Sequence, residues 1–115
     1  PQPRSYSVTA GVTNAALINA SKVLAEAAAP FDIRVNVVNP GPIETDRMVY
    51  LVKEKADQLG VSEVEAKRVL ADVTALKRFG TPEEVAAAVV FLASSRASFI
   101  TGIMLDIDGG QVQAI

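Results

Sequence analysis

Apolar residues recur along the chain with two different periods, which predict helices and strands. Residues from about 7 to 29 are rich in alanine and leucine and include no proline. Apolar residues recur there at helical spacings, as one face of a helix requires. That face comprises Leu17, Ala20, Leu24 and Ala28. We expect the helix to end near Pro30, because proline cannot continue the hydrogen-bond ladder.

Two shorter stretches alternate between apolar and polar positions, as strands do. Residues 33–39, IRVNVVN, are mostly β-branched and predict a strand that the PGP sequence at 40–42 ends. Residues 102–110, GIMLDIDGG, predict a second strand that ends at its two final glycines. The residues on one side of this second strand would be Ile103, Leu105 and Ile107.

Two capping sequences mark the starts of further helices. In SEVE, residues 62–65, a hydroxyl precedes a carboxylate by three positions, which predicts a helix over residues 63–73. TPEE at residues 81–84 repeats the pattern, adds a proline at the first helical position, and predicts a helix to about Ser94. A weaker helical pattern covers residues 46–58.

The predicted order is helix, strand, two or three helices, strand, which is typical of an α/β fold with a parallel sheet. Two strands are few for such a sheet, since parallel sheets are usually buried on both faces and have several members. We therefore expect the rest of the sheet to come from an N-terminal part of the same protein or from another chain. The alternative is a small self-sufficient α/β domain.

Composition narrows the possible functions. The 115 residues suffice for one domain, and half of them are hydrophobic. The net charge of -2 argues against nucleic acid as a partner. The absence of cysteine and histidine excludes disulfides, Cys or His metal sites and imidazole catalysis. No apolar run approaches the roughly 18 residues of a membrane span, and the N-terminus lacks the apolar core of a signal peptide. We expect a cytoplasmic protein without a membrane partner.

Two long stretches together resemble the short-chain dehydrogenase/reductase family. They are INASKVLAEAAAPFDIRVNVVNPGPIETDRM and LKRFGTPEEVAAAVVFLASSRASFITGIMLDIDGGQ. The resemblance covers about residues 7 to 111. It implies a doubly wound, Rossmann-like parallel sheet, an NAD or NADP cofactor, and a small-molecule carbonyl or alcohol as substrate. It also implies that residues 1–115 form the C-terminal part of one such domain, whose N-terminal nucleotide-binding half, with its glycine-rich turn, is absent here.

The family's catalytic motif, Tyr-x-x-x-Lys, is degenerate in this sequence. Its register places Ala10 at the tyrosine position and Asn14 at the lysine position. Alanine has no proton to transfer, and asparagine has no charge with which to lower a neighbouring pKa. Tyr6, four residues earlier, is either a displaced acid or an ordinary tyrosine near a helix start. The catalytic residues are therefore unknown.

The loop after the first strand resembles the segment with which the family holds the nicotinamide. Four residues match the family pattern and are predicted to bind the cofactor: Pro40, Gly41, Ile43 and Thr45. The resemblance gives Ile43 backbone contacts to the carboxamide and gives Thr45 a hydroxyl contact. The alternative is a plain turn that ends a strand.

Two other sets of residues have alternative interpretations, and a third has one. Residues 46–75 correspond to the family's variable lid, where Met48, Tyr50, Leu51 and Val52 would form either a pocket wall or ordinary core. Asp106 and Asp108 would suit a metal site, but the family places DGG at a structural turn, so we expect no metal. A structural role at the helix entry is expected for Arg78, Glu83 and Glu84.

The resemblance also suggests a partner and two competing functions. Family members commonly pair the first helix with its copy in another subunit, and small residues permit close packing, so we expect a homo-oligomer through the 7–29 helix. The first function is NAD(P)-dependent oxidation and reduction with a divergent catalytic motif. The second is binding of a nucleotide or partner without hydride transfer, because fold does not imply function. A fragment without activity of its own is compatible with either.

Overall fold

The computed structural model describes residues 8–111, which form four α-helices and a pair of short strands. The elements in chain order are α1 (Val8–Ala28), η2 (Ala29–Phe31), β1 (Val37–Pro40), α2 (Asp46–Leu59), α3 (Glu63–Ala71), α4 (Pro82–Ala93), η3 (Ser95–Ala97) and β2 (Met104–Ile107). Every predicted element is present, and both predicted helix starts at capping sequences are confirmed. Within residues 8–111, no helix is long and apolar enough to cross a membrane.

The strands β1 and β2 pair in parallel, as the α/β pattern predicts. Val37 N donates to Ile103 O at 2.9 Å, and Gly41 N donates to Ile107 O at 3.0 Å. The first strand begins later than the predicted residue 33. Upstream of β1 the partners are partly side chains: Val35 N donates to Thr101 Oγ1, and Asn36 Oδ1 accepts from Ile103 N. The regular ladder therefore starts only at Val37.

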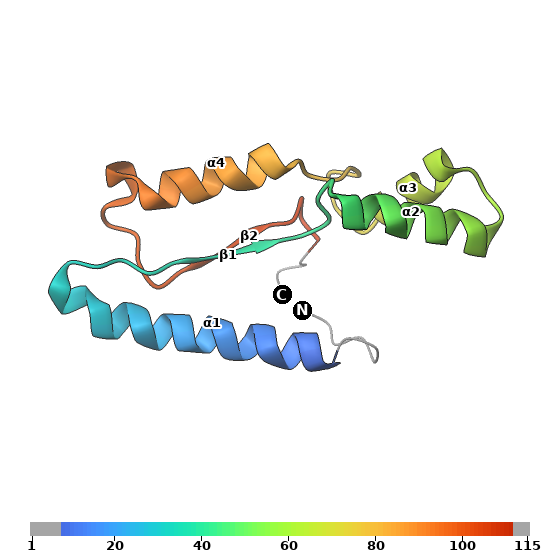
Figure 1. Ribbon diagram of the computed structural model, residues 1–115. Helices are drawn as coiled ribbons and strands as arrows, with labels where there is room; N and C mark the ends of the chain where they lie inside the picture. The colour runs from blue at the N-terminus through green and yellow to red at the C-terminus, as the bar shows by residue number, and fades with distance from the viewer. Residues whose placement is uncertain (1–7, 112–115) are drawn as a thin grey trace. The chain divides into compact units, whose positions relative to one another are not determined.

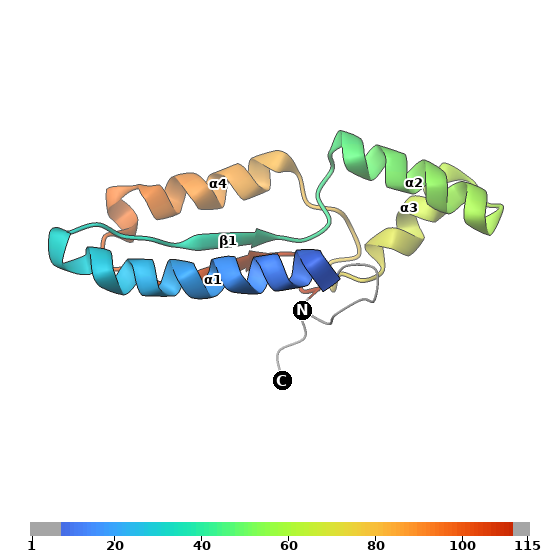
Figure 2. The ribbon, with the colours of Figure 1, turned by 60° about the horizontal axis from the view of Figure 1, so that its bottom comes forward.

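The chain divides into two compact units, and β1, β2 and α4 each run from one into the other. In the first unit, which includes α1 and residues 89–105, α1 lies on one side of the paired segments and the end of α4 on the other (Figure 1 and Figure 2). Lys22 Nζ on α1 donates to Gly102 O at 3.2 Å. The helix and the segment before β2 are therefore tied directly.

The covered face of α1 differs from the predicted one. Ala25 is 2% exposed, whereas Leu17 and Leu24 are 59% and 56% exposed. The covered stripe comprises Ile18, Ser21, Ala25 and Ala28. The helix itself was predictable. Because α1 carries apolar residues on all of its sides, periodicity alone did not determine which stripe meets the strands.

In the second unit, α2 and α3 form a helical hairpin with its own small core (Figure 1). Gly60 ends α2 in the left-handed region, with φ of 64°, where glycine has no steric penalty. Ser62 then caps α3 by accepting from Glu65 N at 3.2 Å. The buried core residues are Val52, Ala56, Ala66, Ala71 and Phe79.

Candidate functional site

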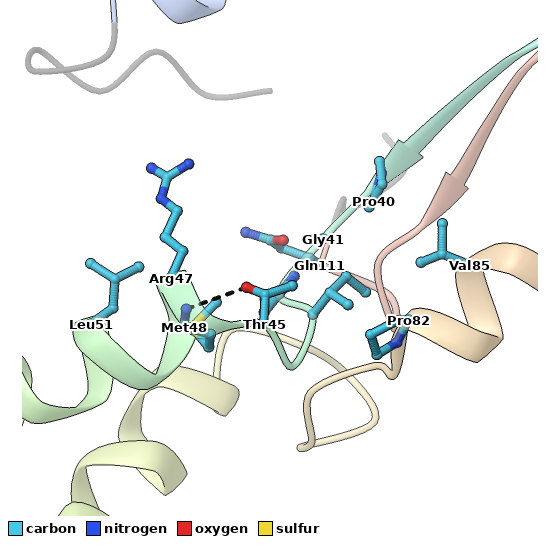
Figure 3. Close-up of a pocket in the computed structure, with 11 residues that line it drawn as sticks. Pro40, Gly41, Thr45, Arg47, Met48, Leu51, Pro82, Val85 and Gln111 are labelled. Carbon is cyan, nitrogen blue, oxygen red and sulfur yellow. Dashed lines mark hydrogen bonds between the residues drawn. The ribbon is translucent and has the colours of Figure 1, made fainter.

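A hollow of about 630 Å³ lies in the second unit, beside the end of β1 and the starts of α2 and α4 (Figure 3). All four predicted cofactor-binding residues line it. The lining residues are Pro40, Gly41, Pro42, Ile43, Thr45, Arg47, Met48, Leu51, Pro82, Val85 and Gln111. Carboxyl ends of parallel strands are where open α/β sheets place their ligands. The hollow is therefore the candidate functional site.

Gly41 allows the ends of the two strands to meet. A Cβ at this position would lie 2.7 Å from both Cα and Cβ of Asp108, which is closer than van der Waals contact. The glycine is thus required by the protein's own second strand. The sequence analysis predicted a cofactor role for Gly41 and did not anticipate this contact with Asp108.

Ile43 continues the sheet beyond β1 through a parallel bridge to Gly80. Gly80 N donates to Pro42 O, and Glu44 N donates to Gly80 O, both at 2.9 Å. These hydrogen bonds to Gly80 are made by Pro42 and Glu44, the residues on either side of Ile43. The N–H and C=O of Ile43 itself therefore point to the opposite side of the strand. Neither of these Ile43 groups makes a hydrogen bond with another residue in the described part of the chain. One donor and one acceptor are therefore available beside the hollow.

Thr45 is the N-cap of α2. Its Oγ1 accepts a hydrogen bond from Met48 N at 3.3 Å (Figure 3). A threonine hydroxyl has one proton to donate and two lone pairs, so capping leaves the proton available. The same side chain thus fixes the helix start and offers a donor at the edge of the hollow.

The predicted lid residues divide between the hollow and the core. Met48 and Leu51, three residues apart on α2, line the hollow, whereas Val52 belongs to the core of the helical hairpin. Tyr50 is 65% exposed and is not part of the lining. Met48 and Leu51 therefore fit the pocket-wall alternative, Val52 fits the core alternative and Tyr50 fits neither, because a helix turns adjacent residues to different faces.

Two polar lining residues were missed by the sequence analysis. Arg47 lies in the first turn of α2, and Gln111 follows the glycine turn after β2. The position of Gln111 could have been inferred, because the carboxyl ends of paired parallel strands meet at the same edge. Arg47 carried no comparable signal.

One ion pair and a capping box fix the entry to α4 near the hollow. Arg78 donates to both carboxylate oxygens of Glu84, at 2.7 and 2.9 Å. Glu84 also accepts from Thr81 N, and Thr81 Oγ1 accepts from Glu84 N, which completes the predicted capping box. The hydrogen bonds from Arg78 and Thr81 lower the pKa of Glu84 to about 2. The structural reading of Arg78 and Glu84 is confirmed.

The two aspartates near β2 have structural partners. Asp106 Oδ1 accepts from Asn39 Nδ2 at 2.8 Å, and Asp108 Oδ1 accepts from Gly110 N at 2.9 Å. Gly109 and Gly110 have φ of 61° and 80°, as a tight turn requires. The structural-turn reading of DGG is confirmed. Residues 8–111 contain no cluster of three or more His, Cys, Asp or Glu residues suited to a metal ion.

The positions of the degenerate catalytic motif lie on α1. Asn14 is exposed and stands one turn before Ile18, in line with the covered stripe of the helix. Ala10 lies one turn earlier in the same helix. Tyr6, the suggested substitute acid, lies outside the described residues. The catalytic roles of these positions stay predictions.

Comparison with known proteins decides the family. A sequence profile described as "Enoyl-(Acyl carrier protein) reductase" matches residues 4–111. The chain belongs to the short-chain dehydrogenase/reductase family. The resemblance read from the sequence is thereby confirmed, together with the Rossmann-like fold class.

Several reductases of this family are similar to the chain. The NADPH-dependent reductase BacG of Bacillus subtilis (strain 168) is 41% identical over 114 residues, which are 99% of this chain and 44% of BacG. The crystal structure of YwfH, an NADPH-dependent reductase involved in bacilysin biosynthesis, matches with a TM-score of 0.88 and 40% identity, over 99% of this chain and 43% of YwfH. L-sorbose reductase from Gluconobacter frateurii, complexed with NADPH and L-sorbose, matches with a TM-score of 0.83 and 38% identity, over 90% of this chain and 40% of the reductase. The chain thus spans less than half the length of these relatives.

Proposed function

We propose that the chain is the C-terminal part of an NAD(P)-dependent oxidoreductase that moves a hydride to or from a carbonyl or alcohol. The observation that carries this proposal is the edge of the hollow at Ile43. There a peptide N–H and C=O have no hydrogen-bond partner within residues 8–111, and the hydroxyl of Thr45 lies near them along the same loop. A carboxamide has one acceptor and one donor group, so it can pair with both peptide groups at once.

Each predicted cofactor residue has a role in this proposal. Ile43 would bind the carboxamide through its backbone, and the Thr45 hydroxyl would donate to the same group. Pro40 and Gly41 would bring the chain to the ring without an intruding side chain. When bound, the dinucleotide supplies or accepts the hydride, and these residues orient its reactive ring toward the hollow.

The remaining nucleotide site belongs, in this proposal, to an N-terminal part of the same domain. Support comes from the length of the relatives, more than twice that of the matched segment. The relatives BacG and YwfH are NADPH-dependent reductases, so we expect NADPH to bind more tightly than NADH. We further propose a cytoplasmic homo-oligomer, in which α1 packs against its copy.

A second candidate function is binding without hydride transfer. Its support is the loss of both motif residues, since Ala10 and Asn14 leave no phenol and no ammonium at the usual positions. In the enzymatic alternative, the proton comes from Tyr6 or from a residue of the N-terminal part.

Dinucleotide titration tests the cofactor site, with two capping residues as a matched pair. Thr45→Val and Ser62→Ala each remove a hydroxyl that caps a helix, α2 or α3, and each should cost about 1 kcal/mol of stability. Only Thr45 lines the hollow. In the protein expressed from its complete reading frame, Thr45→Val should raise the NADPH dissociation constant about tenfold by fluorescence titration. Ser62→Ala should leave that constant unchanged, and equal effects of both variants would contradict the proposed site.

Turnover separates the two candidate functions. The complete protein is saturated with NADPH, and a panel of carbonyl compounds is screened for oxidation of the cofactor. Turnover supports the oxidoreductase, whereas tight binding without turnover of any compound supports the binding protein. Tyr6→Phe then tests the displaced acid: loss of turnover would assign it the role, and retained turnover would remove it.

A further inference from the structure

Arg47 introduces a single charge into an otherwise uncharged hollow. Of the described residues that line the hollow, it alone is ionised at neutral pH, and only Thr45 and Gln111 add other polar side chains. Proline, isoleucine, methionine, leucine and valine side chains supply most of the remaining surface. A ligand in this space would therefore meet apolar walls and one cation.

Arg47 has no partner in the described part of the chain. It makes no hydrogen bond or ion pair there, and the same holds for Lys53 and Lys55 further along α2, whereas four other cations of the unit are paired. The pairs are Lys67–Glu44, Arg68–Glu65, Lys77–Asp72 and Arg78–Glu84. The guanidinium thus keeps its full capacity to bind a ligand.

The place of Arg47 in its helix also lacks a structural explanation. It lies in the first turn of α2, where the positive end of the helix dipole disfavours a cation. A residue that contradicts a local preference without a compensating contact is a candidate for function. The same dipole would favour an anion bound by Arg47.

Arg47 belongs to the α2 wall of the hollow. Leu51 is four residues further along the same helix and Met48 is its neighbour, and both line the space. Gln111 extends its amide into the hollow from the turn after β2, over Gly41 (Figure 3). An amide donor and a guanidinium fork therefore line the same hollow, next to apolar walls.

We propose that Arg47 recognises a carboxylate or phosphate group of the substrate, with Gln111 as a second donor. This inference rests on the proposed function, and it narrows the substrate class to carbonyl compounds, or the corresponding alcohols, that carry an anionic group. The same oxyanion chemistry also occurs in the phosphates of the dinucleotide. We assign it to the substrate because the groups available for the cofactor lie in the Pro40–Thr45 loop, and the carboxamide that they suit is uncharged.

The test uses the complete protein saturated with NADPH and matched pairs of probes. Benzoylformate with its methyl ester, and acetoacetate with its methyl ester, differ within each pair in one negative charge. Dissociation constants are measured by calorimetry, and turnover is followed where it occurs. We expect the acid to bind more tightly than its ester in at least one pair. Arg47→Gln should reduce that preference about tenfold to a hundredfold, and added salt should weaken acid binding in the wild type but not in the variant.

Two further variants and one titration complete the design. Arg47→Lys should retain part of the preference, because an ammonium keeps the charge but loses the planar fork. Lys53→Gln removes an exposed cation from the same helix, outside the lining, and should leave the preference unchanged. NADPH affinity should be unaltered in Arg47→Gln.

The outcomes distinguish this inference from the proposed function. Failure of the wild type to bind any dinucleotide overturns the proposed function, and this inference with it. Dinucleotide binding with no preference for the acid in either pair overturns the inference alone. A loss of NADPH affinity in Arg47→Gln, without a change in acid preference, assigns the residue to the cofactor phosphates and also overturns it.

Discussion

At the scale of single residues, the site depends on groups that serve the fold and the hollow together. Thr45 caps α2 and lines the hollow, and Gly41 lets the two strand ends meet beside it. Ile43 packs its side chain over Gly80 while its peptide groups face the other edge. Loss of any of these contacts should therefore change both stability and ligand binding.

Gly41→Ala tests the close approach of the strand ends. The added methyl would meet Asp108 Cα at 2.7 Å, so the backbone must shift, and we expect a loss of about 1–3 kcal/mol in unfolding free energy. Urea denaturation of the complete protein measures it. Gly11→Ala is the control, because Gly11 has no neighbour within 4 Å of the new methyl group in the described chain. That variant should gain about 0.5–1 kcal/mol, since alanine favours a helix interior, and a similar loss in both variants would contradict the argument.

At the scale of elements, Arg34 joins the segment before β1 to the end of α4. Its guanidinium donates to Leu92 O at 2.7 Å and to Ser94 O and Ile100 O, both at 3.2 Å. The last carbonyls of a helix lack partners within the helix, and a cation also complements the negative end of its dipole. One side chain thus satisfies the helix end and the connection that leads to β2.

Arg34→Met tests these hydrogen bonds. The substitution removes the guanidinium and keeps an aliphatic side chain of similar length to that of the arginine stem. Three carbonyls lose a charged donor, so we expect a loss of about 2 kcal/mol in unfolding free energy. Arg96→Met removes an exposed arginine from the same unit and should change stability by less than about 0.5 kcal/mol. The midpoints of urea unfolding of the complete protein give both values, and equal midpoints for the two variants would show that these hydrogen bonds contribute nothing.

At the scale of the whole molecule, α1 has more apolar surface than the described chain covers. Val12 and Val23 are 66% and 60% exposed, on the side away from the stripe that meets the strands. A helix that is apolar on all sides is usually buried on all sides. The exposed side supports both proposals made for the whole protein, the missing part of the sheet and the homo-oligomer.

Ala20→Arg tests the oligomer through this exposed side of α1. Ala20 lies in line with Ala16 and one helical turn before Val23 and Leu24, so a long cation there would keep two helices apart. Light scattering on the complete protein should show a smaller assembly than the wild type. Glu26→Arg places the same side chain on the polar flank of α1 and should preserve the assembly. A wild-type mass of a single chain would end the oligomer proposal.

The sequence by itself determined the elements and the family. Helix periods, two capping boxes and alternating β-branched residues are local signals, because each depends on neighbours within a few positions, and all of the predicted elements were found. The pattern of residues around PGPIET likewise indicated four of the eleven residues that line the hollow. Local signals did not predict that Arg47 lines the hollow or that β1 begins at Val37.

Only the tertiary structure decided which surfaces meet. It showed that α1 covers the strands with the stripe through Ala25, that Val52 is core while Leu51 faces the hollow, and that Gln111 lies over Gly41. These outcomes depend on contacts between residues far apart in the chain, and a helix with apolar residues on every side has no local preference among them. The physical reason is that burial follows from the summed packing of distant segments, which no single stretch of sequence contains.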